Sequence, residues 1–141
     1  MAGERTRAIV TDAAVDIANF MAEVADDGAG AVVTFQGVVR NHDAGEAVEY
    51  IDYQAHPDAQ SILEVIVAEI AARPGVHRVA CVHRWGHLEV GQTAMVAAVS
   101  ASHRHQAFSA VSDLVDEVKL RLPIWKKQGF SDGQSRWSGV P

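Results

Sequence analysis

Cysteine is almost absent from the sequence, since Cys81 is the only one in 141 residues. This excludes an internal disulfide framework. No apolar run approaches the roughly 18 residues of a membrane-spanning helix, and the first residues lack the apolar stretch of a secretory signal. The sequence also has no G-x-G-x-x-G, no phosphate-binding P-loop and no G-x-S-x-G motif. These absences favour a cytoplasmic protein that does not associate with membranes.

The composition is that of a globular protein, with 48% hydrophobic and 21% charged residues. We expect residues 1–141 to form one domain, with room for a small appended subdomain. The net charge of -6 argues against a general nucleic-acid binder. However, Lys and Arg number six against four acids in 101–141, and six against fourteen in 1–100. Such a basic last third suits a small anionic ligand, although chance clustering on a solvated face explains it equally simply.

The hydrophobic periodicity predicts elements in the order β-α-β-β-α-β-β-α, followed by a tail. Strands are expected at 7–11, 30–39, 47–55, 77–85 and 94–101. Helices are expected at about 13–25, 59–72 and 102–122, with Asp12, Asp58 and Ser102 as their N-caps. The helix at 59–72 should pack through an apolar stripe of Ile62, Leu63, Ile66, Val67 and Ile70. Residues 40–45 and 86–92 are predicted to be a loop and a turn, and 124–141 irregular or short strand. This order predicts an α+β fold with a mixed or antiparallel sheet and packed helices.

Lys119 lies at the border of an apolar helix face in the predicted helix 102–122. That face consists of Ala107, Val111, Leu114, Val115, Val118 and Leu122. A lysine at such a border loses part of its hydration and can serve as a reactive amine. The alternative is a lysine whose stem only covers apolar surface.

The start of the same helix carries His103, Arg104 and His105, where the helix dipole disfavours cations. Free backbone N–H groups at this end bind anions well. A positive cluster there is therefore expected if a phosphate or carboxylate docks, and otherwise represents three exposed side chains.

Two further basic positions follow from strand and turn geometry. Pro123 stops the helix, so Lys126 and Lys127 should point to opposite sides of an extended segment, and one of them could return toward Lys119. Arg40 ends a buried strand, a position that commonly delivers an arginine to a cleft.

The histidines and Cys81 do not have a strong metal-ligand spacing. Cys81 and His83 share a strand face, and His87, His103 and His105 complete the set, but the H-x-H pair diverges on a helix. We expect no metal and no cofactor, and Cys81 as a structural thiol.

Several blocks of the sequence occur together in one known family. They are Gly30-Ala31, Phe35-Gln36-Gly37-Val38-Val39-Arg40, Val82-His83-Arg84-Trp85-Gly86-His87-Leu88, Ser102-His103-Arg104, Lys119 with Pro123-Ile124-Trp125-Lys126-Lys127, and Arg136-Trp137. In this order and spacing the chain resembles the large, catalytic subunits of molybdopterin synthase, the MoaE family. The resemblance implies an α/β hammerhead-like fold with a small β subdomain.

The resemblance also implies a reaction. The family adds two sulfurs to cyclic pyranopterin monophosphate (precursor Z), which forms the dithiolene of molybdopterin. The sulfur arrives as a thiocarboxylate on the C-terminal Gly-Gly of a small ubiquitin-like subunit. Two large subunits form a homodimer at the centre of a heterotetramer.

Residue roles carry over by position. The resemblance implies that Lys119 and Lys126 are catalytic, and that Arg40, His103, Arg104, Phe35 and Lys127 bind substrate. Two alternatives remain at this point: a non-catalytic dimeric module that binds a phosphorylated metabolite, and a scaffold with a solvated basic surface.

Overall fold

The computed structural model describes residues 5–138, and one of its sheets has four strands. The strands are β1 (Thr6–Thr11), β5 (Val76–Arg84), β7 (Thr93–Ala101) and β2 (Ala31–Val38), in the spatial order β1-β5-β7-β2. β1 and β5 are parallel, whereas β5–β7 and β7–β2 are antiparallel. The sheet is therefore mixed, as the sequence predicted.

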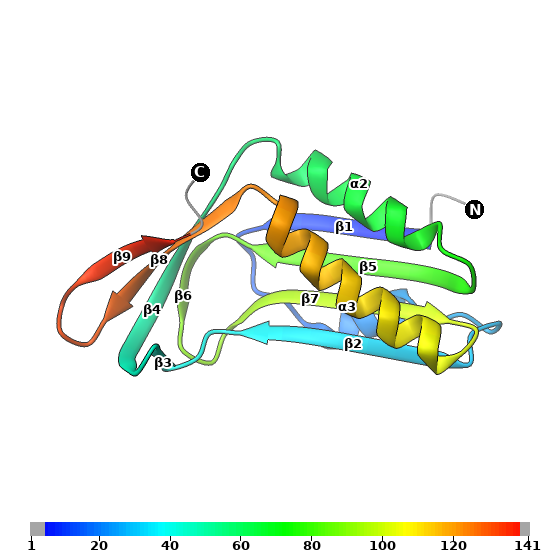
Figure 1. Cartoon of the computed structure of the whole chain (residues 1–141), viewed down its shortest axis with the longest axis horizontal. Helices are drawn as coiled ribbons and strands as arrows, with labels where there is room; N and C mark the ends of the chain where they lie inside the picture. The colour runs from blue at the N-terminus through cyan, green and yellow to red at the C-terminus, as the bar shows by residue number, and fades with distance from the viewer. Residues whose placement is uncertain (1–4, 139–141) are drawn as a thin grey trace.

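Helices pack on both faces of this sheet because its central strands are apolar on both sides. α2 (Ala59–Ala71) and α3 (Arg104–Arg121) lie on one face (Figure 1) and pack on Val79, Cys81, Ala97 and Val99. The alternate residues Ala80, Val82, Val96 and Ala98 face α1 (Ile17–Glu23). The apolar stripes predicted for the two long helices are the ones that pack into the core.

A second sheet, of five strands, projects from one end of the four-stranded sheet (Figure 1). It contains β3 (His42–Asp43), β4 (Glu46–Ala55), β8 (Ile124–Phe130) and β9 (Ser135–Ser138), and β6 (Gly86–Glu89) pairs with β4. It has its own core of buried side chains: Val39, Val48, Ile51, Leu88, Ala94 and Phe130. This sheet is the small β subdomain of the expected fold, and α3 leads directly into it through Pro123.

Several local predictions need correction. Asp16, not Asp12, caps α1, and its carboxylate accepts a hydrogen bond from the Ala18 N–H at 3.0 Å. His103, not Ser102, is the N-cap of α3, where its side chain and that of Gln106 form a capping box. Both helices thus begin later than the periodicity indicated, because a periodic apolar pattern does not mark the first helical turn.

Strands also occur where a loop and a turn were expected, and in the tail they realise the short-strand alternative that the sequence left open. β3 lies in the predicted loop 40–45, and β6 lies in the predicted turn 86–92. β8 and β9 form an antiparallel hairpin in the predicted tail. These strands are short or polar, so only their pairing with β4 or with each other defines them. Residues 1–4 and the end of the predicted tail, 139–141, lie outside the described residues.

Candidate active site

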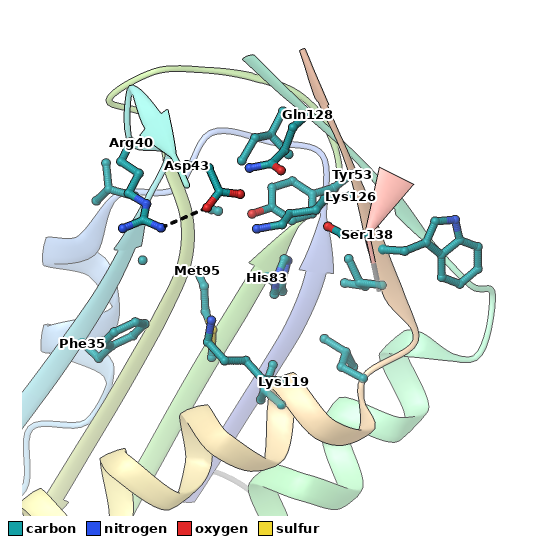
Figure 2. Close-up of a pocket in the computed structure, with 18 residues that line it drawn as sticks. Phe35, Arg40, Asp43, Tyr53, His83, Met95, Lys119, Lys126, Gln128 and Ser138 are labelled. Carbon is teal, nitrogen blue, oxygen red and sulfur yellow. Dashed lines mark hydrogen bonds and ion pairs between the residues drawn. The ribbon is translucent and has the colours of Figure 1, made fainter. Parts of the chain in front are cut away.

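A cavity of about 420 Å³ opens where the two sheets meet. Its walls come from β2, β4, β5, β7 and β8, and the last turns of α3 close one side (Figure 2). Segments far apart in the sequence therefore contribute to one site. The lining includes Phe35, Arg40, Lys119 and Lys126, four of the residues that the sequence selected.

Lys119 reaches the cavity from the C-terminal end of α3. Its neighbours Val118 and Leu122 are buried against the sheet and also line the cavity. Figure 2 shows the Lys119 side chain rising from the helix toward Met95. The border position predicted from the helical wheel thus places the amine at the cavity wall.

Lys126 faces the cavity from β8, on the opposite wall. It is directly paired with Tyr53 of β4, and both side chains line the cavity. Lys127 is paired with Asp52 on the other face of the sheet, and its Nζ lies 5.8 Å from the centroid of the Trp137 ring. The structure therefore brings Lys126, but not Lys127, toward Lys119.

Arg40 follows the end of β2 and forms an ion pair with Asp43, with 3.4 Å between Nη2 and Oδ1. Both residues line the cavity, and both side chains are substantially exposed to solvent, 68% and 38%. A partly exposed guanidinium at the rim is well suited to bind an anionic group that enters from solvent. Phe35, on the same strand, supplies an aromatic wall.

His83 also lines the cavity, from the end of β5. Its Nδ1 lies 2.8 Å from the carbonyl oxygen of Arg84, so Nδ1–H donates this hydrogen bond. Its ring packs edge-to-face on Tyr53, with 5.2 Å between centroids. Burial, together with the positive charge of Lys119, lowers the pKa of His83 to about 4, although the hydrogen bond to the Arg84 carbonyl opposes this shift. At neutral pH the imidazole is uncharged.

His103 and Arg104 do not reach this cavity. They lie at the N-terminal end of α3. Arg104 precedes Lys119 by fifteen residues, so the two positions are separated by about 22 Å along the helix. Their neighbour Ser102 belongs to a separate hydrogen-bonded chain. Its Oγ lies 2.9 Å from Nε2 of His77, whose Nδ1 lies 3.2 Å from Asp26.

The residues selected from the sequence do not include Asp43, Tyr53, Gln128 and Ser138, which are polar residues that line the site. Alternation along β4 is a signal that could have found Tyr53, since Ile51 and Tyr53 lie on the strand face that lines the cavity. From the sequence, His83 was considered as a metal ligand beside Cys81 and as part of a block shared with the family, but not as a lining residue of the site. Cys81 is instead fully buried, and burial raises the pKa of its thiol to about 12.

The sequence matches one known family. The model of the MoaE protein family matches residues 10–121. The chain belongs to the MoaE family. The resemblance drawn from the sequence blocks is thus confirmed.

Individual relatives agree with this assignment. The molybdopterin synthase catalytic subunit of Nostoc is 42% identical over 120 residues, which cover 83% of this chain and 73% of the relative. The chain spans 63% of the length of the rice relatives and 61% of the Arabidopsis one. The prediction of an enzyme of molybdopterin biosynthesis is confirmed at the level of the family.

Solved structures confirm the α+β fold. The crystal structure of molybdopterin synthase from Staphylococcus aureus is 33% identical, with a TM-score of 0.85, and covers 92% of this chain and 95% of its own. One chain of the complex of subunits 1 and 2 of molybdopterin-converting factor from Helicobacter pylori also shares the fold. It is 18% identical and has a TM-score of 0.73, and the match covers 95% of this chain and 90% of that chain.

Among residues 5–138, no cluster of three or more His, Cys, Asp or Glu side chains is arranged to hold a metal ion. In the same range, no helix combines the length and the apolar character needed to cross a membrane.

Proposed function

We propose that this chain is the catalytic subunit of a molybdopterin synthase. In this proposal it transfers sulfur from the C-terminal thiocarboxylate of a small ubiquitin-like subunit to cyclic pyranopterin monophosphate. Two such transfers build the dithiolene of molybdopterin. The observation that carries the proposal is that Lys119 and Lys126, from a helix and a strand, face one cavity together with Arg40.

The cavity suits the two anionic reactants of this reaction. The thiocarboxylate and the substrate phosphate are both negatively charged, and three cationic side chains surround the space they would share. Arg40, at the rim, is placed to take the phosphate, and Phe35 to pack on the pterin. Lys119 and Lys126 are the candidates for proton transfer and for polarising the carbon that sulfur attacks.

His103 and Arg104 require a second copy of the chain to join this site. Within one chain they lie about 22 Å along α3 from Lys119, too far to share a small ligand. In the proposed homodimer, a symmetric contact would bring them to the cavity of the partner. Mixing inactive Lys119→Ala with inactive Arg104→Ala protein should then restore part of the activity, because mixed dimers contain one complete site. No recovery on mixing argues against this arrangement.

A single-turnover assay tests the function directly. The chain is mixed with thiocarboxylated small subunit and cyclic pyranopterin monophosphate, and molybdopterin is detected as its fluorescent oxidised derivative. Lys119→Ala should form almost no product. Lys127→Ala is the matched control, since it removes a lysine that lies outside the cavity, and it should retain activity.

The outcomes separate the proposed enzyme from its main alternative. Product from the native chain, and its loss in Lys119→Ala, supports the synthase. Substrate binding without product, despite confirmed binding of the small subunit, would indicate a non-catalytic module for a phosphorylated metabolite. Product formation at the native rate in Lys119→Ala would show that Lys119 takes no part in the reaction.

A further inference from the structure

The polar groups around the cavity are dominated by hydrogen-bond donors. Arg40, Lys119 and Lys126 are cations with no acceptor atom. Asp43 has carboxylate oxygens, but it is already paired with Arg40. These charged groups can hold an anion, but they are not neutral acceptors for the N–H and O–H groups of a ligand. Tyr53, Gln128 and Ser138 also line the cavity and carry acceptor oxygens, whereas the ring of His83 is an acceptor whose direction a hydrogen bond fixes.

His83 has such an acceptor. Because Nδ1–H donates to the Arg84 carbonyl, the neutral ring carries its lone pair on Nε2. Among residues 5–138, His83 makes this hydrogen bond and the ring contact with Tyr53, and no protein group is hydrogen-bonded to Nε2. The ring orientation is held from both sides, by the carbonyl and by the edge-to-face packing at an interplanar angle of 78°.

The charge state of His83 distinguishes recognition from proton transfer. A general base works best when its pKa lies near the working pH. Burial lowers the pKa of His83 to about 4, so the ring is a weak base at neutral pH and does not carry a proton. An uncharged acceptor beside cationic side chains can bind a neutral donor without competing for the anion.

We propose that Nε2 of His83 is a specificity-determining acceptor for an uncharged N–H or O–H group of the ligand whose anionic part lies against Arg40 and the lysines. This inference rests on the proposed function, and it identifies the group that recognises the pterin half of the substrate. A reduced pterin offers N–H donors, whereas its phosphate offers none. A ligand that keeps the phosphate but lacks such a donor loses this contact and leaves Nε2 unpaired.

Two conservative variants separate the two nitrogens of His83. The amide nitrogen of Asn reaches the position of Nδ1, so His83→Asn keeps a donor to Arg84 and removes the acceptor in the cavity. The longer Gln brings an amide oxygen near the position of Nε2, so His83→Gln keeps a neutral acceptor there. Both variants are uncharged, and thermal unfolding of each checks that the fold is retained.

The binding of two probes is then compared by calorimetry: cyclic pyranopterin monophosphate and inorganic phosphate. We expect His83→Asn to weaken pyranopterin binding about tenfold and to leave phosphate binding unchanged. His83→Gln should restore most of the pyranopterin affinity. In single-turnover assays at varied pyranopterin concentration, the same loss should raise the half-saturating concentration of the pyranopterin and leave the limiting rate nearly unchanged, since the contact exists before the reaction.

Three results would overturn the proposal. They are native pyranopterin affinity in His83→Asn, an equal loss for both probes, and equal affinities of the Asn and Gln variants. In each case the native chain still turns over, so the proposed function stands. If the native chain itself neither binds nor converts the pyranopterin, the proposed function fails, and the specificity role of His83 fails with it.

Discussion

Lys126 and Lys127 are adjacent in β8, yet their side chains lie on opposite faces of the sheet. Lys126 pairs with Tyr53 and lines the cavity, whereas Lys127 pairs with Asp52 and extends over Trp137. The two lysines are therefore a matched pair that differs in access to the site. This difference allows the role of charge near the site to be separated from a role in the cavity.

Lys126→Ala should lower the single-turnover rate by about 100-fold or more, the usual effect of losing a group that moves a proton. Lys127→Ala should change the rate by less than about twofold and remove at most a weak contact with Trp137. Both variants lose one positive charge, so nonspecific attraction of anions falls equally. Equal rate losses in the two variants would show that charge alone, and not position, governs the rate.

The ion pair between Arg40 and Asp43 leads to a second prediction. Asp43 places a negative charge beside the guanidinium that is proposed to bind phosphate. Asp43→Asn should therefore tighten phosphate binding about threefold to tenfold at low salt, with a smaller gain at high salt because the pair is partly exposed. Calorimetric titration with inorganic phosphate at two ionic strengths measures this. Weaker binding would mean instead that Asp43 orients Arg40.

The elements that the sequence predicted best are those with long, one-sided apolar patterns. The stripe of α2 and the face of α3 that carries Leu114 and Val118 are buried as expected, because a period of 3.6 residues encodes the face directly. Lys119 was found through this pattern, since its position at the edge of the face is a property of one helix. Alternation in an extended segment is also local, and it predicted that either Lys126 or Lys127 would face Lys119, whereas the choice of Lys126 came from the family resemblance.

Features that depend on pairing between distant segments could not be predicted. β6 is defined by its pairing with β4. For example, His87 of β6 pairs with Asp52 of β4, which lies 35 residues earlier in the sequence. The neutral state of His83 depends on burial and on Lys119, which belong to the tertiary structure. The separation of His103 and Arg104 from the cavity follows from the straight path of α3, whereas the basic composition of the last third had suggested one site.

Gly129 provides a test of how closely β4 and β8 approach each other. It is directly paired with Tyr50, and a Cβ atom at Gly129 would overlap with the Tyr50 ring. Gly129→Ala should therefore lower the free energy of unfolding by about 1–3 kcal/mol, as overpacking does. Urea unfolding measures this loss. In the double variant with Tyr50→Ala, the penalty of Gly129→Ala should largely disappear, whereas additive losses would place the strain elsewhere.

Two histidines should influence stability against pH in opposite directions. Burial holds the pKa of folded His83 at about 4, below its value of about 6.5 in the unfolded chain. Between these values the unfolded state binds more protons, so His83 makes the protein less stable as the pH falls from 6.5 toward 4. The side chains of Glu89 and Asp52, at 3.0 and 2.7 Å, raise the pKa of His87. His87 therefore stabilises the fold below pH 6.5, and this contribution is lost as the pH rises through its folded pKa.

Calorimetric Tm values at pH 7 and pH 5 distinguish these contributions. His83→Gln should reduce the fall in Tm between pH 7 and pH 5, because the variant has no buried imidazole to protonate. His87→Gln should increase that fall by a smaller amount, since His87 is about half exposed and its ion pairs are screened. The two variants are matched in chemistry and differ only in burial and partners. A fall in Tm that is the same in both variants and in the native chain would mean that neither histidine controls stability between pH 7 and pH 5.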